Sequence, residues 1–141
     1  MGVTFVGQTS IEVDPEDFPT DELRETFQCS SGEPIPGEWH GVPIRSLIDV
    51  ARVSSGTTHA RIRGSDGFTV CLPIGTVIDG LIAFDRRPLD DSRTVTDANF
   101  PRFVAPGISG IRTVKSVDRV ETIQLDSNQE AQEFENLLLD S

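Results

Sequence analysis

Cys29 is the residue of this 141-residue chain that is best suited, by its type and its place in the sequence, to take part in chemistry. It follows Phe27-Gln28 and precedes a run rich in Ser, Gly and Pro, so its thiol is expected at the edge of a loop. A deprotonated thiol is a nucleophile and a soft metal ligand. Free cysteines are also often small buried hydrophobic residues. The residues around Cys29 leave both interpretations open.

Other combinations of reactive side chains are weaker. The two serines after Cys29 could pair with His40 or His59, but no nucleophile elbow surrounds them. The two histidines lie far apart in the sequence, and Cys29 and Cys71 form no CxxC pattern, which disfavours a zinc site. Cys71 lies between Val and Leu in a predicted strand and is expected in the core.

The charge of the chain limits its partners. The formal net charge is −11 and the isoelectric point about 4.4, with Lys115 as the sole lysine. An acidic field repels nucleic-acid phosphates and anionic lipid surfaces, so neither is an expected partner. An acidic surface that is poor in lysine is also typical of halophilic proteins, which favours a halophilic source.

The length predicts a single domain, residues 1–125, followed by an acidic tail or short helix, 126–141. No stretch approaches the ~18 apolar residues of a membrane span, and the N-terminus does not resemble a signal peptide. A cytoplasmic location is therefore expected. The oligomeric state is left open.

The pattern of strands and turns predicts an α+β fold that is mostly β, with no βαβ rhythm. Two hairpins are expected, one with its turn around Gly7-Gln8 and one with its turn at Asp66-Gly67. The further expected elements are a helical turn at Phe18–Leu23, a strand at Glu25–Cys29, a Ser/Gly/Pro loop up to Trp39, a helix at Ile44–Val53 with Pro43 at its first position, a helical turn at Gly75–Gly80, strands at Leu81–Phe84, Arg102–Ala105 and Thr113–Leu125, a surface loop at Arg86–Phe100, and a docked helix or frayed end at Gln129–Leu139.

The order of motifs resembles the molybdopterin-binding domain of the sulfite oxidase-like oxidoreductase family, from about Val3 to Ile123. The matching segments, in order, are FQCSSG, EWHGVPIRSLI, GSDGFTVCLPI, LIAFDRRPL, FPRFVAPG and SGIRTVKSVDRVE. The resemblance implies the sulfite oxidase-type fold and a molybdenum–molybdopterin cofactor. It also implies a two-electron oxygen-atom-transfer reaction on a small-molecule substrate, with an electron-transfer partner.

The resemblance assigns roles to six residues. Cys29 matches the cysteine whose thiolate binds molybdenum. The residues that match the positions holding the pterin and its phosphate are Arg102, Thr113, Val114 and Lys115, with Arg112 placed to assist.

Two departures from the family pattern leave an alternative open. Ser30-Ser31-Gly32 stand where sulfite-oxidising members carry an Arg, and Phe68 stands where they carry a Tyr. Phenylalanine cannot donate a hydrogen bond to a substrate anion, which disfavours sulfite oxidation. The alternative is a non-catalytic, metal-free relative that acts as a binding or partner-docking module.

Overall fold

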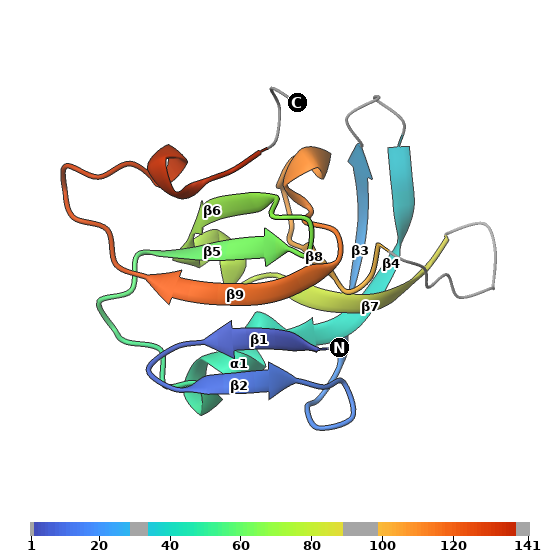
Figure 1. Ribbon diagram of the computed structural model, residues 1–141. Helices are drawn as coiled ribbons and strands as arrows, with labels where there is room; N and C mark the ends of the chain where they lie inside the picture. Colours follow the sequence, from blue (N-terminus) through green and yellow to red (C-terminus); the bar gives the residue numbers. More distant parts are fainter. Residues whose placement is uncertain (1, 29–33, 89–98, 138–141) are drawn as a thin grey trace.

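The computed structural model describes residues 2–28, 34–88 and 99–137, apart from the side chain of Ile111. Two β-sheets face each other across a shared core (Figure 1). The strands are β1 (Val3–Val6), β2 (Ser10–Val13), β3 (Asp21–Gln28), β4 (Pro34–Pro43), β5 (His59–Gly64), β6 (Thr69–Pro73), β7 (Leu81–Arg87), β8 (Arg102–Val104) and β9 (Val117–Ile123). The helices are α1 (Ile44–Val50), α2 (Ile74–Val77) and the 3₁₀ turns η1 (Gly110–Arg112) and η2 (Ala131–Phe134).

The first sheet, called sheet A, has the strand order β2-β1-β9-β5-β6. Its two hairpins are those that the sequence predicts: β1 pairs with β2 and β5 pairs with β6. Gly67 provides the positive φ of 94° in the turn between β5 and β6. The hairpins are joined through β9, which runs antiparallel to β5 and parallel to β1. Strand β9, near the C-terminus, therefore joins the N-terminal hairpin to the hairpin of β5 and β6.

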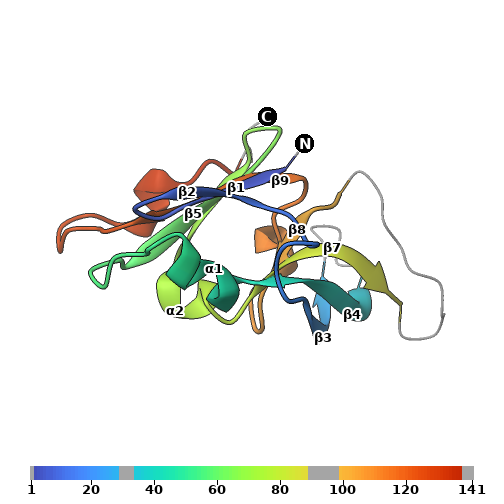
Figure 2. The same ribbon diagram turned by 90° about the horizontal axis from the view of Figure 1, so that it is seen from below.

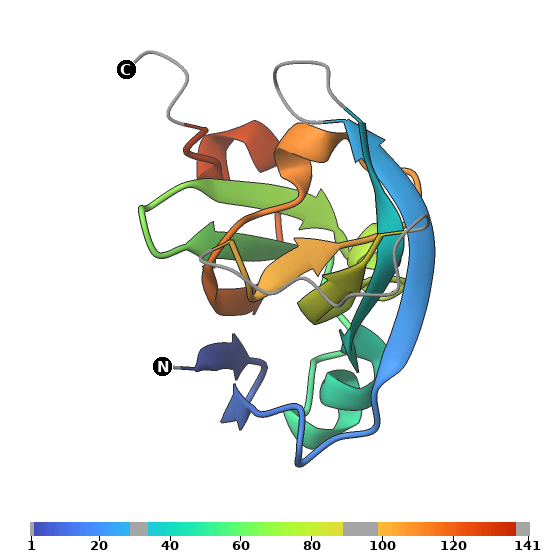
Figure 3. The ribbon, with the colours of Figure 1, turned by 90° about the vertical axis from the view of Figure 1, so that its right-hand side faces the viewer.

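The second sheet, called sheet B, is antiparallel with the order β3-β4-β7-β8. Its β3–β4 hairpin forms a long curved band along one side of the molecule (Figure 3). Gly41 lets β4 approach β7 closely, since a Cβ there would lie 1.9 Å from the carbonyl oxygen of Ile82. Sheet B carries β3 and β4, which flank Cys29, and β8, which precedes residues 112–115; the strand after those residues, β9, belongs to sheet A.

The core lies between the inner faces of the sheets. Alternate residues of the strands of sheet A point inward, as in β5, where Ala60 and Ile62 are fully buried while Arg61 and Arg63 face outward. Helices α1 and α2 lie on the same side of sheet A as sheet B (Figure 2). The opposite face of sheet A is its outer face. Within the described residues, no helix is both long enough and apolar enough to cross a membrane.

Two local predictions are wrong. The helical turn at Phe18–Leu23 is absent because β3 already begins at Asp21 and pairs with β4 along its whole length. The loop before Trp39 is shorter than expected, since β4 begins at Pro34. The prolines are tolerated there because residues 34–37 of β4 pair only with β3; pairing with β7 starts at Glu38.

Other boundaries differ by a few residues. Pro43 is the last residue of β4 and precedes α1, which ends at Val50, short of the predicted Val53. The strand predicted at Leu81–Phe84 extends to Arg87, while the one predicted at Thr113–Leu125 is confined to Val117–Ile123.

The C-terminal segment forms the short turn η2 and then docks on the edge of β6. Thr69 and Asn136 exchange two backbone hydrogen bonds of 2.7 and 2.9 Å. The expectation of a docked element is confirmed for residues 131–136, although it is a 3₁₀ turn and a bridge and not an α-helix. Residues 138–141 lie outside the described part of the chain.

Candidate functional site

The predicted metal ligand, Cys29, lies outside the described residues, as do residues 30–33. The structure describes both strands that flank them: β3 ends at Gln28, and β4 begins at Pro34. The loop after β8 lies against β3, because the backbone N–H of Gly107 donates to a Glu25 carboxylate oxygen at 3.0 Å. The segment predicted to hold the pterin therefore starts beside the strand that leads to Cys29.

Arg102 is buried at the start of β8, with 5% of its surface exposed. Its Nε donates to the carbonyl and hydroxyl oxygens of Thr113, each at 3.2 Å, and its Nη2 donates to the hydroxyl at 2.7 Å. The Thr113 hydroxyl donates in turn to the carbonyl of Gly110. The structure thus brings Arg102 and Thr113 together, and these hydrogen bonds from the guanidinium group hold the backbone of the turn 110–115 in place.

Trp39 provides the apolar surface on which Arg102 rests. The indole is fully buried, and its ring centroid lies 5.5 Å from the guanidinium carbons of both Arg86 and Arg102. Its ring N–H donates to the carbonyl of Glu25 at 3.2 Å. Cations above an indole face are attracted to it, so Trp39 fixes Arg102 in place. The sequence indicates only a structural role for Trp39, not this contact.

The residues after Thr113 present hydrogen-bond donors. Val114 is 1% exposed, and its carbonyl accepts from the N–H of Phe103 at 3.0 Å. Among the described residues, the backbone N–H groups of Val114 and Lys115 have no hydrogen-bond partner. Buried backbone N–H groups without a partner are rare in proteins. Lys115 is exposed, and its ammonium group forms no ion pair with a described residue. Two adjacent N–H donors and an ammonium group are the donor set that binds an anion.

Arg112 lies next to this turn but is engaged elsewhere. Both of its Nη groups bind the carboxylate of Glu135, and the Nη2–Oε1 distance is 3.2 Å. The Glu135 side chain is only 6% exposed, and it also accepts the backbone N–H of Cys71 at 2.9 Å. The sequence does not predict this contact, because Glu135 is one of many acids in the tail.

Cys71 is buried, as the sequence predicts, with 3% of its surface exposed. It lies opposite Arg61 in the β5–β6 hairpin, beneath the C-terminal segment. Burial raises the pKa of the Cys71 thiol, and the Glu135 carboxylate raises it further. Both effects favour the protonated form of the thiol.

Phe68, which the sequence resemblance aligns with a tyrosine, is partly buried and packs against the core. Its backbone N–H donates to the Asp66 carboxylate at 3.0 Å, which closes the turn before β6. The ring itself offers no donor to a ligand.

The sequence gives no sign of a cluster of charged groups around His40. Its Nδ1 lies 2.6 Å from Asp85, while Nε2 lies 3.2 Å from Glu38 and 3.6 Å from Glu22. Burial alone would lower the pKa of His40, but hydrogen bonds to Asp85 and Glu38 outweigh this and raise it. Hydrogen bonds from Arg24 and His40 lower the pKa of Glu38.

The ligand atoms of Glu22, Glu38 and His40 lie within 4.8 Å of one another, a spacing that could hold a metal ion. Ionised carboxylates only accept hydrogen bonds, so a doubly protonated His40 ring can donate to both Asp85 and Glu38 without a metal ion.

Comparison with known proteins points to one family. The model of the oxidoreductase molybdopterin binding domain matches residues 13–131. No curated protein matches the sequence. Among solved structures, the chain is similar to the crystal structure of the sulfane dehydrogenase SoxCD from Paracoccus pantotrophus, with a TM-score of 0.74 and 19% sequence identity. The match covers 91% of this chain and 39% of that chain. The likeness confirms the predicted mostly-β, sulfite oxidase-type fold.

Proposed function

Because this chain belongs to the family of oxidoreductase molybdopterin-binding domains, we propose that it binds a molybdenum–molybdopterin cofactor through a Cys29 thiolate and serves in oxygen-atom transfer. The bound cofactor would supply the two-electron redox change at the metal. A thiolate is a suitable ligand because soft sulfur donors bind such metals well. Cys29 follows β3, the strand that the 106–110 loop contacts through Glu25.

The observation that carries the proposal is the donor set at the turn 113–115. The N–H groups of Val114 and Lys115 have no partner among the described residues, and Lys115 is exposed. Together they fit the anionic phosphate of a pterin cofactor. In a chain of net charge −11, this turn is one of few places that could attract such a group.

The remaining residues act by holding this turn in place. Arg102, buried over Trp39, binds both the carbonyl and the hydroxyl of Thr113 and so fixes the backbone that presents the donors. Arg112 is a weaker candidate for a direct contact, since both of its Nη groups already bind Glu135. We therefore assign Lys115 the direct charge contact and Arg102 a positioning role.

The test is elemental and pterin analysis of protein made in a host that supplies the cofactor. Wild type should carry stoichiometric molybdenum and pterin. Cys29→Ser should lose molybdenum, because a hydroxyl is a poor ligand for it, and Lys115→Gln should lose pterin. Cys71→Ala is the matched thiol control and should keep both, because Cys71 is buried beneath Glu135.

Folded wild-type protein without molybdenum or pterin would contradict the proposal and leave the metal-free binding module as the interpretation. Equal molybdenum in wild type and Cys29→Ser would contradict the assignment of Cys29 as the required metal ligand. Substrate identity would then be sought with the loaded protein, starting from compounds that need no hydrogen bond from the Phe68 position.

A further inference from the structure

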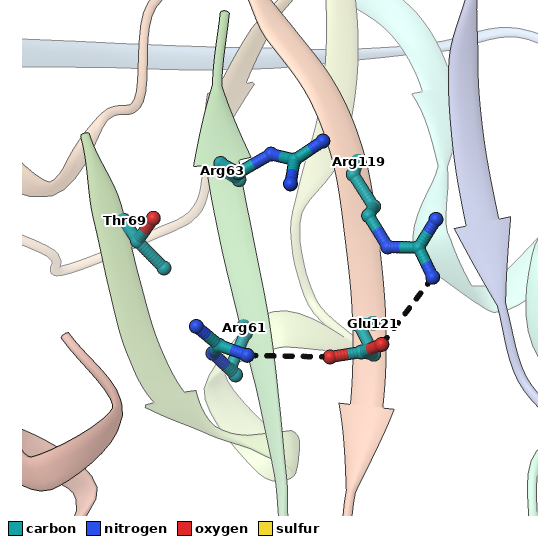
Figure 4. A pocket seen from close by; sticks show the side chains of 5 residues that line it. All are labelled: Arg61, Arg63, Thr69, Arg119 and Glu121. Carbon is teal, nitrogen blue, oxygen red and sulfur yellow. Dashed lines mark hydrogen bonds and ion pairs between the residues drawn. The ribbon is translucent and has the colours of Figure 1, made fainter. Parts of the chain in front are cut away.

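Three arginines gather on the outer face of sheet A. Arg61 and Arg63 extend from β5 and Arg119 from β9, and with Glu121 and Thr69 they line a depression of about 300 Å³ (Figure 4). These are three of the chain's 12 cationic residues, against 23 acidic ones. Such a concentration of positive charge is unexpected on so acidic a protein.

The strand register places two of the three arginines opposite each other. Arg61 stands opposite Glu121, but Arg63 stands directly opposite Arg119. Like charges at directly opposed positions of neighbouring strands destabilise a sheet. Figure 4 shows the Arg63 guanidinium directed toward Arg119. An anion held between the two side chains would remove this repulsion.

Neighbouring groups orient two of the three guanidinium groups. The two carboxylate oxygens of Glu121 lie 3.4 Å from Arg61 Nη1 and 3.3 Å from Arg119 Nη2. Arg61 Nε also donates to the carbonyl of Phe134 at 3.2 Å. Glu121 thus lies between Arg61 and Arg119 and restrains both guanidinium groups, which reduces the entropy lost when a ligand binds.

Several N–H donors remain available after these contacts. Arg63 uses Nε to bind Asp118 at 3.0 Å, and neither of its Nη groups has a partner among the described residues. The same is true of Nε and Nη1 of Arg119. The two side chains are 49% and 39% exposed, so a ligand from solution can reach them. A guanidinium edge with two free donors matches two oxygens of a sulfate, phosphate or similar group.

We propose that this depression binds a small oxyanion, of the sulfate or phosphate type, between Arg63 and Arg119, with Arg61 contributing charge. Its volume is at the low end for small-molecule sites, which suits a single anionic group. The net charge of −11 opposes an extended polyanion such as nucleic acid. The site uses none of the residues assigned to the pterin, so it stands or falls independently of the proposed cofactor.

The experiment is a titration with sodium sulfate at constant ionic strength, followed by the NMR signals of the arginine Nε–Hε groups. Arg63 and Arg119 should shift along a saturable curve, while Arg45, paired with Asp79 elsewhere on the surface, should not. A parallel titration with methyl phosphate separates two sources of the anion. Binding of sulfate alone supports a free inorganic ion, and binding of both supports the anionic group of a larger molecule.

Variants test the residue assignment. Arg63→Gln and Arg119→Gln should each weaken sulfate binding about tenfold, because each removes one charged, bidentate donor. Arg45→Gln removes the same charge at a distant position and should bind as wild type. Each depression variant removes a cross-strand repulsion but also an exposed ion pair, of Arg63 with Asp118 or Arg119 with Glu121, so both should melt close to wild type. Linear, non-saturating shifts, equal shifts at Arg45, or unchanged binding by both depression variants would overturn the proposal.

Discussion

The ion pair between Arg112 and Glu135 should contribute far more to stability than the surface ion pairs of this protein. Glu135 is 6% exposed, binds both Nη groups of Arg112, and accepts the N–H of Cys71. In Glu135→Gln the side-chain carbonyl can still accept the Cys71 N–H. The variant therefore removes the charge and one of the two contacts with Arg112, while the packing stays nearly the same.

The expected loss follows from burial. Removing one partner of a fully buried ion pair costs about 3–5 kcal/mol, and a hydrogen bond to a charged group contributes about 1.5–3 kcal/mol. Arg112 is 31% exposed, so water can solvate it in part after the change. We expect Glu135→Gln to lower the free energy of unfolding by about 2 kcal/mol, which is within the range for a hydrogen bond to a charged group and below the cost for a fully buried pair.

The assay is a double-mutant cycle by urea unfolding, with Arg112→Met, Glu135→Gln and the double variant. The coupling energy should be about 2 kcal/mol. The control cycle uses Arg45 and Asp79, whose side chains lie 2.6 Å apart but are 66% and 53% exposed. Because exposed ion pairs contribute little, that coupling should be about 0.3 kcal/mol. Equal couplings in the two cycles would refute the reasoning that burial decides the strength of the pair.

Three further predictions concern other parts of the molecule. The pKa of His40 is raised above its ordinary value, so its stabilising contacts with Asp85 and Glu38 are complete below about pH 6.5 and are lost as the pH rises through the folded-state pKa. The difference in urea midpoint between wild type and His40→Gln should accordingly shrink from pH 6 to pH 9, and a difference that stays constant would contradict this. Gly41→Ala should lower the free energy of unfolding by about 3 kcal/mol or more, because its Cβ meets the backbone of β7, whereas Gly75→Ala should be tolerated, since nothing lies within 4 Å of the added atom. Burial and the Glu135 carboxylate both raise the pKa of the Cys71 thiol. Thiol labelling with peptide mapping should therefore find Cys71 unreactive in the folded protein and faster to react in Glu135→Gln. Equal rates in the two proteins would show that Glu135 does not limit the reactivity of this thiol.

The parts of the fold that the sequence predicts well depend on local patterns. The hairpin of β5 and β6 is signalled by alternating residues around Asp66-Gly67, and α1 by apolar residues at helical spacing. The start of β3 is mispredicted because Thr20 followed by acids resembles a helix N-terminus, whereas pairing with β4 determines the structure. Pro34 likewise suggests a loop, and only the strand pairings show that it pairs with β3 and lies beyond the part of β4 that pairs with β7.

The candidate site divides in the same way. The resemblance to the family identifies Arg102, Thr113 and Lys115, and the structure brings the first two into contact. The resemblance gives no indication that Glu135 binds Arg112, since that contact depends on how the tail docks against β6. A pattern in one segment cannot reveal a contact between segments that meet only in the folded chain.

The parallel pairing of β1 with β9 has a consequence for the order of folding. Val6 meets Glu121 across this pairing, so almost the whole chain must be synthesised before the first hairpin can join its sheet. Closing so long a loop costs conformational entropy, which slows folding and delays this step. The β3–β4 hairpin needs only neighbouring residues, and β7 and β8 extend it before β9 emerges from the ribosome. We expect a nascent chain that ends before Val117 to leave the hairpin of β1 and β2 undocked, with Val3 and Phe5 open to chaperones.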